Sequence, residues 1–116
     1  MKKILRDAFL EKLRDPKTKQ TFGFFRNLVN GEECFCAQGC LLDVSGLGKW
    51  KLNLFQFNNG EVSSISTISS YGWVKLFSCD AREAAQISNL ASLNDRGWSL
   101  PKIADWVETN ILETSA

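Results

Sequence analysis

The last third of the chain carries the signals that most restrict its fold. Asp80 and Glu83 form a D-x-x-E capping pair at the start of residues 81–95, which read AREAAQISNLASLND. Gly97 suits the left-handed position that ends a helix, and Ser99 is placed to cap the next one. Because only the link RGW separates the two segments, the sequence predicts a C-terminal helical hairpin.

The first part of the chain predicts a helix, a β-hairpin and a second, shorter helix. Apolar residues at helical spacing predict a helix from Lys3 to Arg14. It ends before Pro16, because the residue preceding a proline avoids the helical region. Asn30-Gly31 lies between two extended runs and favours a primed hairpin turn. A short helix is predicted from about Cys36 to Val44.

The middle of the chain predicts further strands. WKLNLFQF and EVSSISTI flank Asn59-Gly60, which is a second hairpin signal. GWVKLF, residues 72–77, is predicted as a third strand of the same sheet. SSISTISS, residues 63–70, has few large apolar side chains and fits either an edge strand or a loop. The sequence therefore does not decide whether residues 60–72 form an ordered structure.

Together these elements predict an α+β fold in a single domain spanning residues 1–116. The fold combines an N-terminal helix, a small antiparallel sheet built from hairpins, a short central helix and the C-terminal helical hairpin. The hydrophobic fraction is 44%, with eight Phe and four Trp. A chain of this length and composition can bury one core without disulfides as staples.

Histidine is absent from the sequence. It is the usual general base near neutral pH and the commonest metal ligand. Its absence excludes Cys-His and Ser-His nucleophile pairs and zinc sites built on imidazole. The charged start of the chain does not match a signal peptide, and no stretch approaches the roughly 20 apolar residues of a membrane span. We therefore expect a cytoplasmic protein with reduced thiols and no membrane contact.

Three of the four cysteines lie within CFCAQGC, residues 34–40. Together with Cys79 they could converge on zinc, but C-x-C-x3-C departs from the paired knuckles of structural zinc sites. Cys36, at a helix N-terminus, could instead be a nucleophile, although no imidazole base exists for it. Reduced cysteines packed as small apolar side chains are the favoured interpretation, so we expect no metal and no cofactor. Structural roles are predicted for Cys36, Gly39, Cys40, Asp80 and Ser99.

Charge is unevenly distributed along the chain. The first 26 residues carry eight basic and three acidic side chains, a net +5, whereas the whole chain has a formal net charge of +1. A basic end could meet nucleic acid or an acidic protein surface, but a solvated amphipathic helix followed by a charged loop is the favoured explanation. The candidate nucleic-acid contacts are Lys2, Lys3, Arg6, Lys12, Arg14, Lys17 and Lys19.

Tryptophan, asparagine and aspartate side chains supply the remaining candidates for binding. Trp98 and Trp106 lie near polar positions of the helical hairpin, and exposed tryptophan is enriched at interface hot spots. Trp73 belongs to the predicted sheet, whose aromatic residues could also stack on bases. Asn94 and Asp95 could line a ligand pocket, although hydrogen bonds to nearby backbone are the favoured role for such residues in a turn.

Two blocks of the sequence form a recognisable pattern: a Cys-x-x-Gly-x-Leu helix start and a Leu-Asn-Asp-x-Gly-x-Ser segment before the last helix. This pattern resembles small proteins of bacteria and their phages for which no function is known. Residues 47–79 fall outside the two blocks. The resemblance implies a shared architecture and a phage or mobile-element origin, but no particular activity. The matching residues are Cys36, Gly39, Leu41, Leu42 and Asp43, followed by Leu93, Asn94, Asp95, Gly97, Ser99, Ile103, Ala104 and Asp105.

These observations favour a small non-enzymatic binding protein that acts through a protein–protein interface. The expected effect of this binding is inhibition of a host factor. The alternative is a small-molecule or nucleotide binder with a pocket between the sheet and the helical hairpin. A cysteine-dependent enzyme is the third hypothesis. A protein is accordingly the expected partner, ahead of nucleic acid.

Overall fold

The structure is a computed structural model, and it describes residues 1–60, 62–63 and 68–114. Its helices are α1 (Lys3–Arg14), α2 (Ala37–Ser45), α3 (Ser70–Phe77), α4 (Ala81–Asp95) and α5 (Leu100–Asn110). Its strands are β1 (Lys19–Gln20), β2 (Arg26–Val29), β3 (Glu32–Phe35), β4 (Gly48–Lys51), β5 (Leu54–Phe57) and β6 (Val62–Ser63). The α+β class predicted from the sequence is confirmed.

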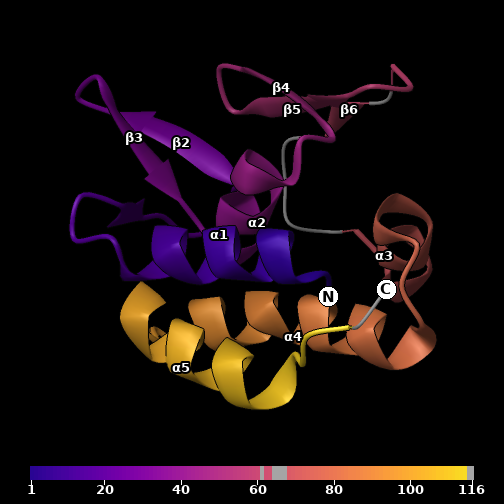
Figure 1. The fold of residues 1–116 in the computed structure, drawn as a ribbon. Helices are drawn as coiled ribbons and strands as arrows, with labels where there is room; N and C mark the ends of the chain where they lie inside the picture. The colour runs from indigo at the N-terminus through magenta and orange to yellow at the C-terminus, as the bar shows by residue number, and fades with distance from the viewer. Residues whose placement is uncertain (61, 64–67, 115–116) are drawn as a thin grey trace.

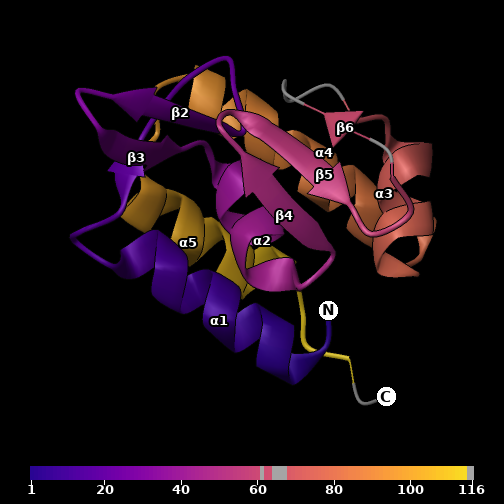
Figure 2. The same ribbon diagram turned by 90° about the horizontal axis from the view of Figure 1, so that it is seen from above.

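The helices form the base of the molecule and the strands lie above it. Figure 1 shows α1, α4 and α5 in the lower part, with α2 between them and the strands and α3 at one end. Viewed from above, the β4–β5 hairpin lies over α2, and the β2–β3 hairpin lies to one side of it (Figure 2). Helix α2 contacts both α1 and α4, so it lies at the centre of the fold.

The strands are divided between two small sheets, with the orders β1-β3-β2 and β4-β5-β6. The hairpin predicted at Asn30-Gly31 is confirmed, since Val29 pairs with Glu32 and both turn residues have positive φ angles of 53° and 79°. Strands β5 and β6 are antiparallel on either side of the second predicted turn. WKLNLFQF, however, is two strands rather than one, because the chain turns at Leu52, where φ is 56°.

The strand predicted at residues 72–77 is wrong, because these residues belong to helix α3. The Ser69 side chain accepts a hydrogen bond from the Gly72 backbone N–H and caps the helix. Trp73 and Phe77, four residues apart, share one helix face and stack with 5.7 Å between their ring centroids. The sequence does not decide whether the neighbouring residues 60–72 are ordered. Of these, residues 61 and 64–67 lie outside the described residues.

The core is one cluster of buried side chains around α2. Residues 37–42 of this helix are all buried. Gly39 makes this burial possible, because a Cβ atom at this position would lie only 1.7 Å from the carbonyl oxygen of Phe25. The same Phe25 oxygen accepts a hydrogen bond of 3.1 Å from the Cys36 N–H. The backbone before β2 is therefore in direct contact with the start of α2.

We expect Gly39→Ala to lower the free energy of unfolding by about 3 kcal/mol or more, because the added methyl group forces two backbone segments apart. Alanine is otherwise the better helix former by about 1 kcal/mol, so intrinsic propensity predicts the opposite sign. Urea denaturation followed by circular dichroism measures the effect. Asn89→Ala, at an exposed position of α4, is the control and should change stability by no more than about 0.5 kcal/mol. Unchanged stability in Gly39→Ala would contradict the contact.

Candidate functional site

The cysteine-rich segment lies inside the core. Cys36 is 2% exposed and precedes α2 as its N-cap, where its Sγ accepts a hydrogen bond of 3.3 Å from the Gly39 N–H. Burial raises the pKa of the Cys36 thiol to about 11. Cys40 is fully buried, and burial raises the pKa of its thiol as well. Both thiols are therefore neutral near pH 7, whereas a nucleophile or a metal ligand needs the thiolate.

The described residues offer no cluster suited to a metal ion: nowhere do three or more cysteine, aspartate, glutamate or histidine side chains come together with that geometry. All four cysteines are free thiols. Cys79 lies apart from the CFCAQGC segment in the sequence and is only partly buried, and its thiol lies 3.6 Å from the Trp73 carbonyl oxygen. Asp80 and Ser99 act as helix caps, accepting hydrogen bonds from backbone N–H groups of α4 and α5.

Asn94 has a structural environment rather than a ligand-binding one. It is 1% exposed. Its Oδ1 accepts hydrogen bonds from Gln20 Nε2 at 2.9 Å and from the Ala37 N–H at 3.2 Å, and its Nδ2 donates to the Thr21 carbonyl oxygen at 3.0 Å. One amide group thus joins α4 to β1 and to the start of α2. Asp95, the next residue, is exposed at the end of α4.

The three candidate tryptophans differ in how far they are buried. Trp73 is fully buried, which removes it from the binding candidates because no partner can reach its ring. Trp98 is partly buried, and the Lys102 ammonium lies 4.2 Å from its ring centroid. Trp106 is also packed partly against the core. Neither Trp98 nor Trp106 is among the strongly exposed apolar side chains of the described chain.

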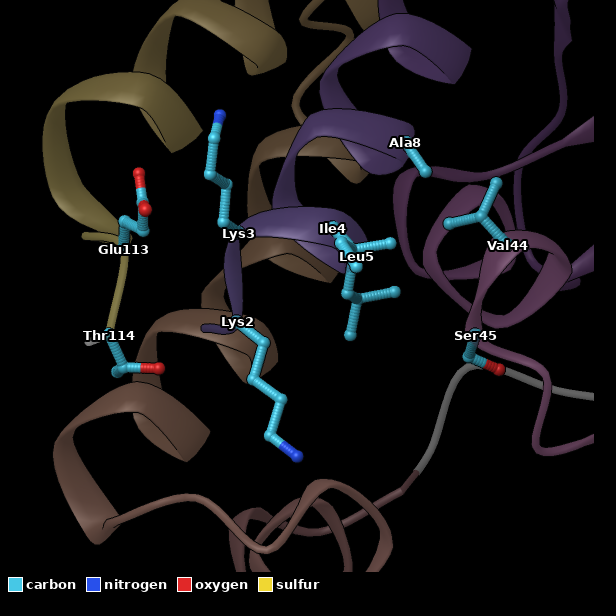
Figure 3. Close-up of a pocket in the computed structure, with 9 residues that line it drawn as sticks. All are labelled: Lys2, Lys3, Ile4, Leu5, Ala8, Val44, Ser45, Glu113 and Thr114. Atoms are coloured by element: carbon cyan, nitrogen blue, oxygen red, sulfur yellow. The ribbon is translucent and has the colours of Figure 1, made fainter. Parts of the chain in front are cut away.

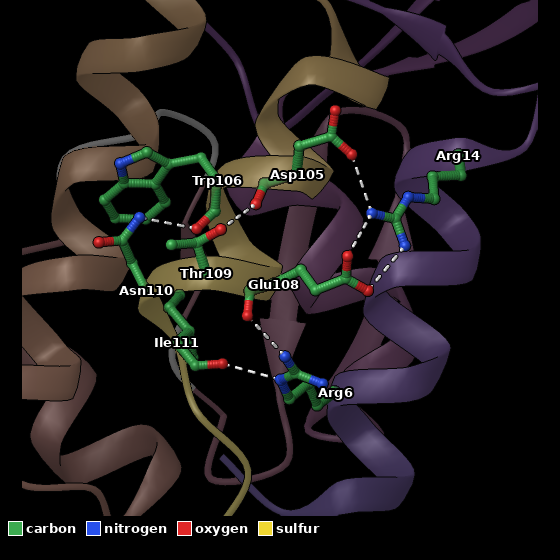
Figure 4. Close-up of polar contacts among 8 residues, drawn as sticks. All are labelled: Arg6, Arg14, Asp105, Trp106, Glu108, Thr109, Asn110 and Ile111. Carbon is green, nitrogen blue, oxygen red and sulfur yellow. Dashed lines mark hydrogen bonds and ion pairs between the residues drawn. The ribbon is translucent and has the colours of Figure 1, made fainter.

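The basic charge of α1 is largely paired within the molecule, and Figure 4 shows its main contacts. Arg6 donates to two carbonyl oxygens at the C-terminal end of α5, those of Glu108 at 2.9 Å and Ile111 at 2.8 Å. A cation is favourable there because these carbonyls lack helical partners and lie at the negative end of the helix dipole. Arg14 forms ion pairs with Asp105 at 2.9 Å and with Glu108. Together these contacts hold α1 against α5.

The remaining basic candidates divide into paired and unpaired lysines. Ion pairs join Lys3 to Asp7, Lys12 to Asp43 and Lys19 to Glu32. The ammonium groups of Lys2 and Lys17 form no ion pair or hydrogen bond with any residue that the structure describes, although the Lys17 backbone N–H donates to Asp15 Oδ1 at 2.9 Å. A nucleic-acid surface needs several cations free to meet phosphates. The seven candidates therefore do not form a continuous free basic surface.

A surface hollow of about 600 Å³ lies where the start of α1 passes the end of α2 (Figure 3). Its apolar lining comes from Ile4, Leu5 and Ala8 of α1 and from Val44 of α2. Ile4 is 87% exposed, although it is a large aliphatic side chain. We call this hollow the α1–α2 groove, and its polar lining consists of Lys2, Lys3, Ser45, Glu113 and Thr114.

Sequence reasoning missed the α1–α2 groove, because Ile4 and Leu5 belong to the apolar residues at helical spacing that predict the first helix, and that spacing alone does not show which of them are exposed. The buried residues of α1 are Phe9, Leu10 and Leu13, all beyond its first turn. No signal in the sequence separates the exposed Ile4 from these buried residues, because Phe9 and Leu10 are adjacent apolar residues as well.

Comparison with known proteins finds no matching family model, no matching curated protein and no matching solved structure. Among the described residues, no helix has the length and apolar character needed to cross a bilayer. The candidate site therefore rests on the geometry of this chain.

We expect alkylation of the native protein near pH 8 to modify Cys79 well before Cys36 and Cys40. Burial both shields the latter thiols and raises their pKa, so that their reactive thiolate is scarce. Iodoacetamide labelling followed by peptide mass spectrometry measures the order. In denaturant all four thiols should react at similar rates, which is the control. Rapid modification of Cys36 in the folded protein would contradict its burial.

Proposed function

We propose that this protein is a small non-enzymatic binding protein that acts by occupying the surface of a partner protein. The α1–α2 groove is the surface we assign to this contact. The observation that carries the proposal is the exposure of Ile4, 87%, beside a hollow lined by further apolar side chains. Such apolar surface with a polar rim is typical of protein-interaction sites.

The main apolar contact with the partner is assigned to the α1–α2 groove and no longer to Trp98 and Trp106. Trp98 and Trp106 already use much of their ring surface inside the molecule, so each offers a partner little new apolar area. The side chain of Ile4, in contrast, is exposed to water in the free protein, so a partner that covers it buries new apolar area. Its neighbour Ala8 is small and leaves room for a side chain of the partner.

A protein partner is favoured over nucleic acid because most of the basic side chains of α1 are engaged. Arg6 and Arg14 hold α5, and Lys12 pairs with Asp43. Releasing them for phosphate would break contacts that hold α1 in place. The groove itself is mainly apolar, which suits a side chain rather than a phosphodiester backbone.

The two other hypotheses receive less support. A cysteine-dependent enzyme would need an accessible thiolate, whereas Cys36 is buried and its pKa is raised. A ligand site at Asn94 would need free amide groups, but its oxygen and nitrogen are both hydrogen-bonded. Four free thiols are compatible with the proposed reducing cytoplasm. The proposed phage or mobile-element origin, with inhibition of a host factor, rests on the sequence resemblance alone.

We expect Ile4→Asp to abolish capture of the partner without loss of folding. Ile4 makes little contact with the core, and an aspartate in the first turn of a helix interacts favourably with the helix dipole. Quantitative affinity capture from cells of the natural host, with tagged wild-type and variant proteins, measures the effect. Circular dichroism verifies that the variant is folded.

Tyr71→Ser is the matched control, because Tyr71 is also strongly exposed, at 71%, but lies on α3 outside the groove. This variant should retain the partner at the wild-type level. A stoichiometric partner that Ile4→Asp also retains would contradict the assignment of the groove.

A further inference from the structure

Strand β4 has one edge that no other described strand covers. It is the first strand in the sheet order β4-β5-β6, so β5 occupies only one of its two sides (Figure 2). The antiparallel pairing with β5 runs without a break from Gly48 to Lys51. The other side of β4 is a free sheet edge, which presents backbone donors and acceptors to whatever lies beside it.

The register shows which backbone groups point outward at this edge. The Asn58 N–H donates to the Leu47 carbonyl oxygen at 2.8 Å, so the backbone groups of Leu47 face the β5 side. In an antiparallel pair the bonding direction alternates from one residue to the next. The N–H and C=O groups of Gly48 and Trp50 therefore point away from β5, and the described chain supplies no partner for them.

Two unpaired lysines border this edge on the outer face of the sheet. Lys49 and Lys51 are exposed, whereas Trp50 between them packs against the core. Their cross-strand neighbours on β5 are Gln56 and Leu54, and neither of these carries a charge. Neither lysine forms an ion pair with any residue that the structure describes.

The carboxylates of the neighbouring elements are already matched. The sequence has no aspartate or glutamate from residue 44 to residue 60. Strand β6, which follows residue 61, is separated from β4 by β5. Next to the hairpin, charged side chains form two ion pairs of 3.0 Å each, Lys12 with Asp43 and Arg26 with Glu33. The outer face of β4 therefore carries two positive charges that no described carboxylate balances.

We propose that an acidic segment of a partner polypeptide adds to the free edge of β4 as a further strand. Its backbone bonds to Gly48 and Trp50, as in other cases of strand addition. Its carboxylates, two residues apart, lie beside Lys49 and Lys51, because alternate residues of a strand share one face. Opposite charges side by side on neighbouring strands stabilise the pairing. None of these residues lines the α1–α2 groove, so this second contact goes beyond the proposed function.

A second copy of this chain fits the edge poorly. In a two-fold pairing of β4 with its equivalent, the lysines of both copies share one face and lie opposite each other. Like charges directly opposite each other destabilise a strand pair. Lysines on an edge strand thus oppose self-pairing, and the edge stays open to an acidic strand.

Single-stranded nucleic acid also fits less well than an acidic strand. Proteins hold such strands by stacking bases on aromatic side chains beside a basic groove. The rings of Phe55 and Phe57 in this hairpin are buried, and the exposed apolar side chain at its turn is Leu52, which has no aromatic face.

The test uses fluorescein-labelled peptides of about ten residues, the length of a long strand. In one peptide glutamate alternates with threonine and valine, and its counterpart has lysine in place of every glutamate. At low salt we expect fluorescence anisotropy to show at least about tenfold tighter binding of the glutamate peptide. When bound, this peptide should slow the hydrogen exchange of the Gly48 and Trp50 amides. Equal or tighter binding of the lysine peptide, or unchanged exchange at Trp50, would overturn the proposal.

Backbone methylation separates strand addition from simple charge attraction. N-methyl groups on alternate residues of the glutamate peptide remove the N–H donors from one side of the strand only. Two such peptides, methylated in the two alternative phases, have the same charge. Methylation on the side that faces β4 should weaken binding by roughly tenfold or more, and methylation on the other side should have little effect. Equal affinities of the two peptides would overturn strand addition.

Charge reversal of single lysines locates the selectivity. Lys51→Glu should weaken binding of the glutamate peptide by roughly threefold or more and strengthen that of the lysine peptide, because one partner of the ion pair changes sign. Lys17→Glu is the matched control, since Lys17 is also exposed with an unpaired ammonium group but lies between α1 and β1. It should leave the preference unchanged, and circular dichroism verifies that both variants are folded. Equal effects of the two variants would overturn the assignment of Lys51.

The remaining outcomes name other occupants of the edge or separate this inference from the proposed function. Tighter binding of an oligothymidylate of about ten nucleotides than of the glutamate peptide would replace the acidic segment by nucleic acid. A dimer in sedimentation that protects the Trp50 amide would replace it by a second copy. If a partner is captured through Ile4 but no glutamate peptide binds, the proposed function survives and this inference fails.

Discussion

The direct contact between two backbone segments, at Gly39 of α2 and the Phe25 carbonyl, is the constraint on which the rest of the structure depends. It lets a nine-residue helix lie inside the molecule with one face against a polypeptide backbone. The helix start needs buried hydrogen-bond partners, because its first N–H groups lack helical ones. The Asn94 side chain and the Cys36 sulfur supply two of them.

This arrangement decides where function can be. Once CFCAQGC is used to begin and pack α2, the thiols of Cys36 and Cys40 are neutral and out of reach of substrates. The basic residues of α1 are similarly used to hold α5. The outer face where α1 and α2 pass each other is one of the surfaces that remain available. There the fold leaves Ile4 and Lys2 exposed beside a hollow, and for this reason we propose a docking surface at this place.

Local signals predicted most of the secondary structure, because capping and turn residues act over a few positions. The α4 and α5 caps and the Asn30-Gly31 hairpin belong to this class. Helix α3 was missed because its aromatic and β-branched residues favour a strand locally, whereas the Ser69 cap and the packing of Trp73 determine a helix.

The site was less predictable than the fold, because it depends on contacts between distant residues. The sequence shows a basic start but not that Arg6 reaches the end of α5, 105 residues away. It likewise does not show that Val44 faces Ile4 across a groove. The burial of Cys34, Cys36 and Cys40, in contrast, agrees with the interpretation that the lack of histidine and of paired zinc knuckles favours.

Native-state hydrogen exchange of the α2 amides tests the central claim most directly, namely that this helix is the interior scaffold of the fold. The account predicts that the amides of Cys40 and Leu41 exchange only when the whole molecule unfolds, so that their protection equals the global free energy of unfolding. Fast exchange of these amides under native conditions, through local opening of α2, would contradict it.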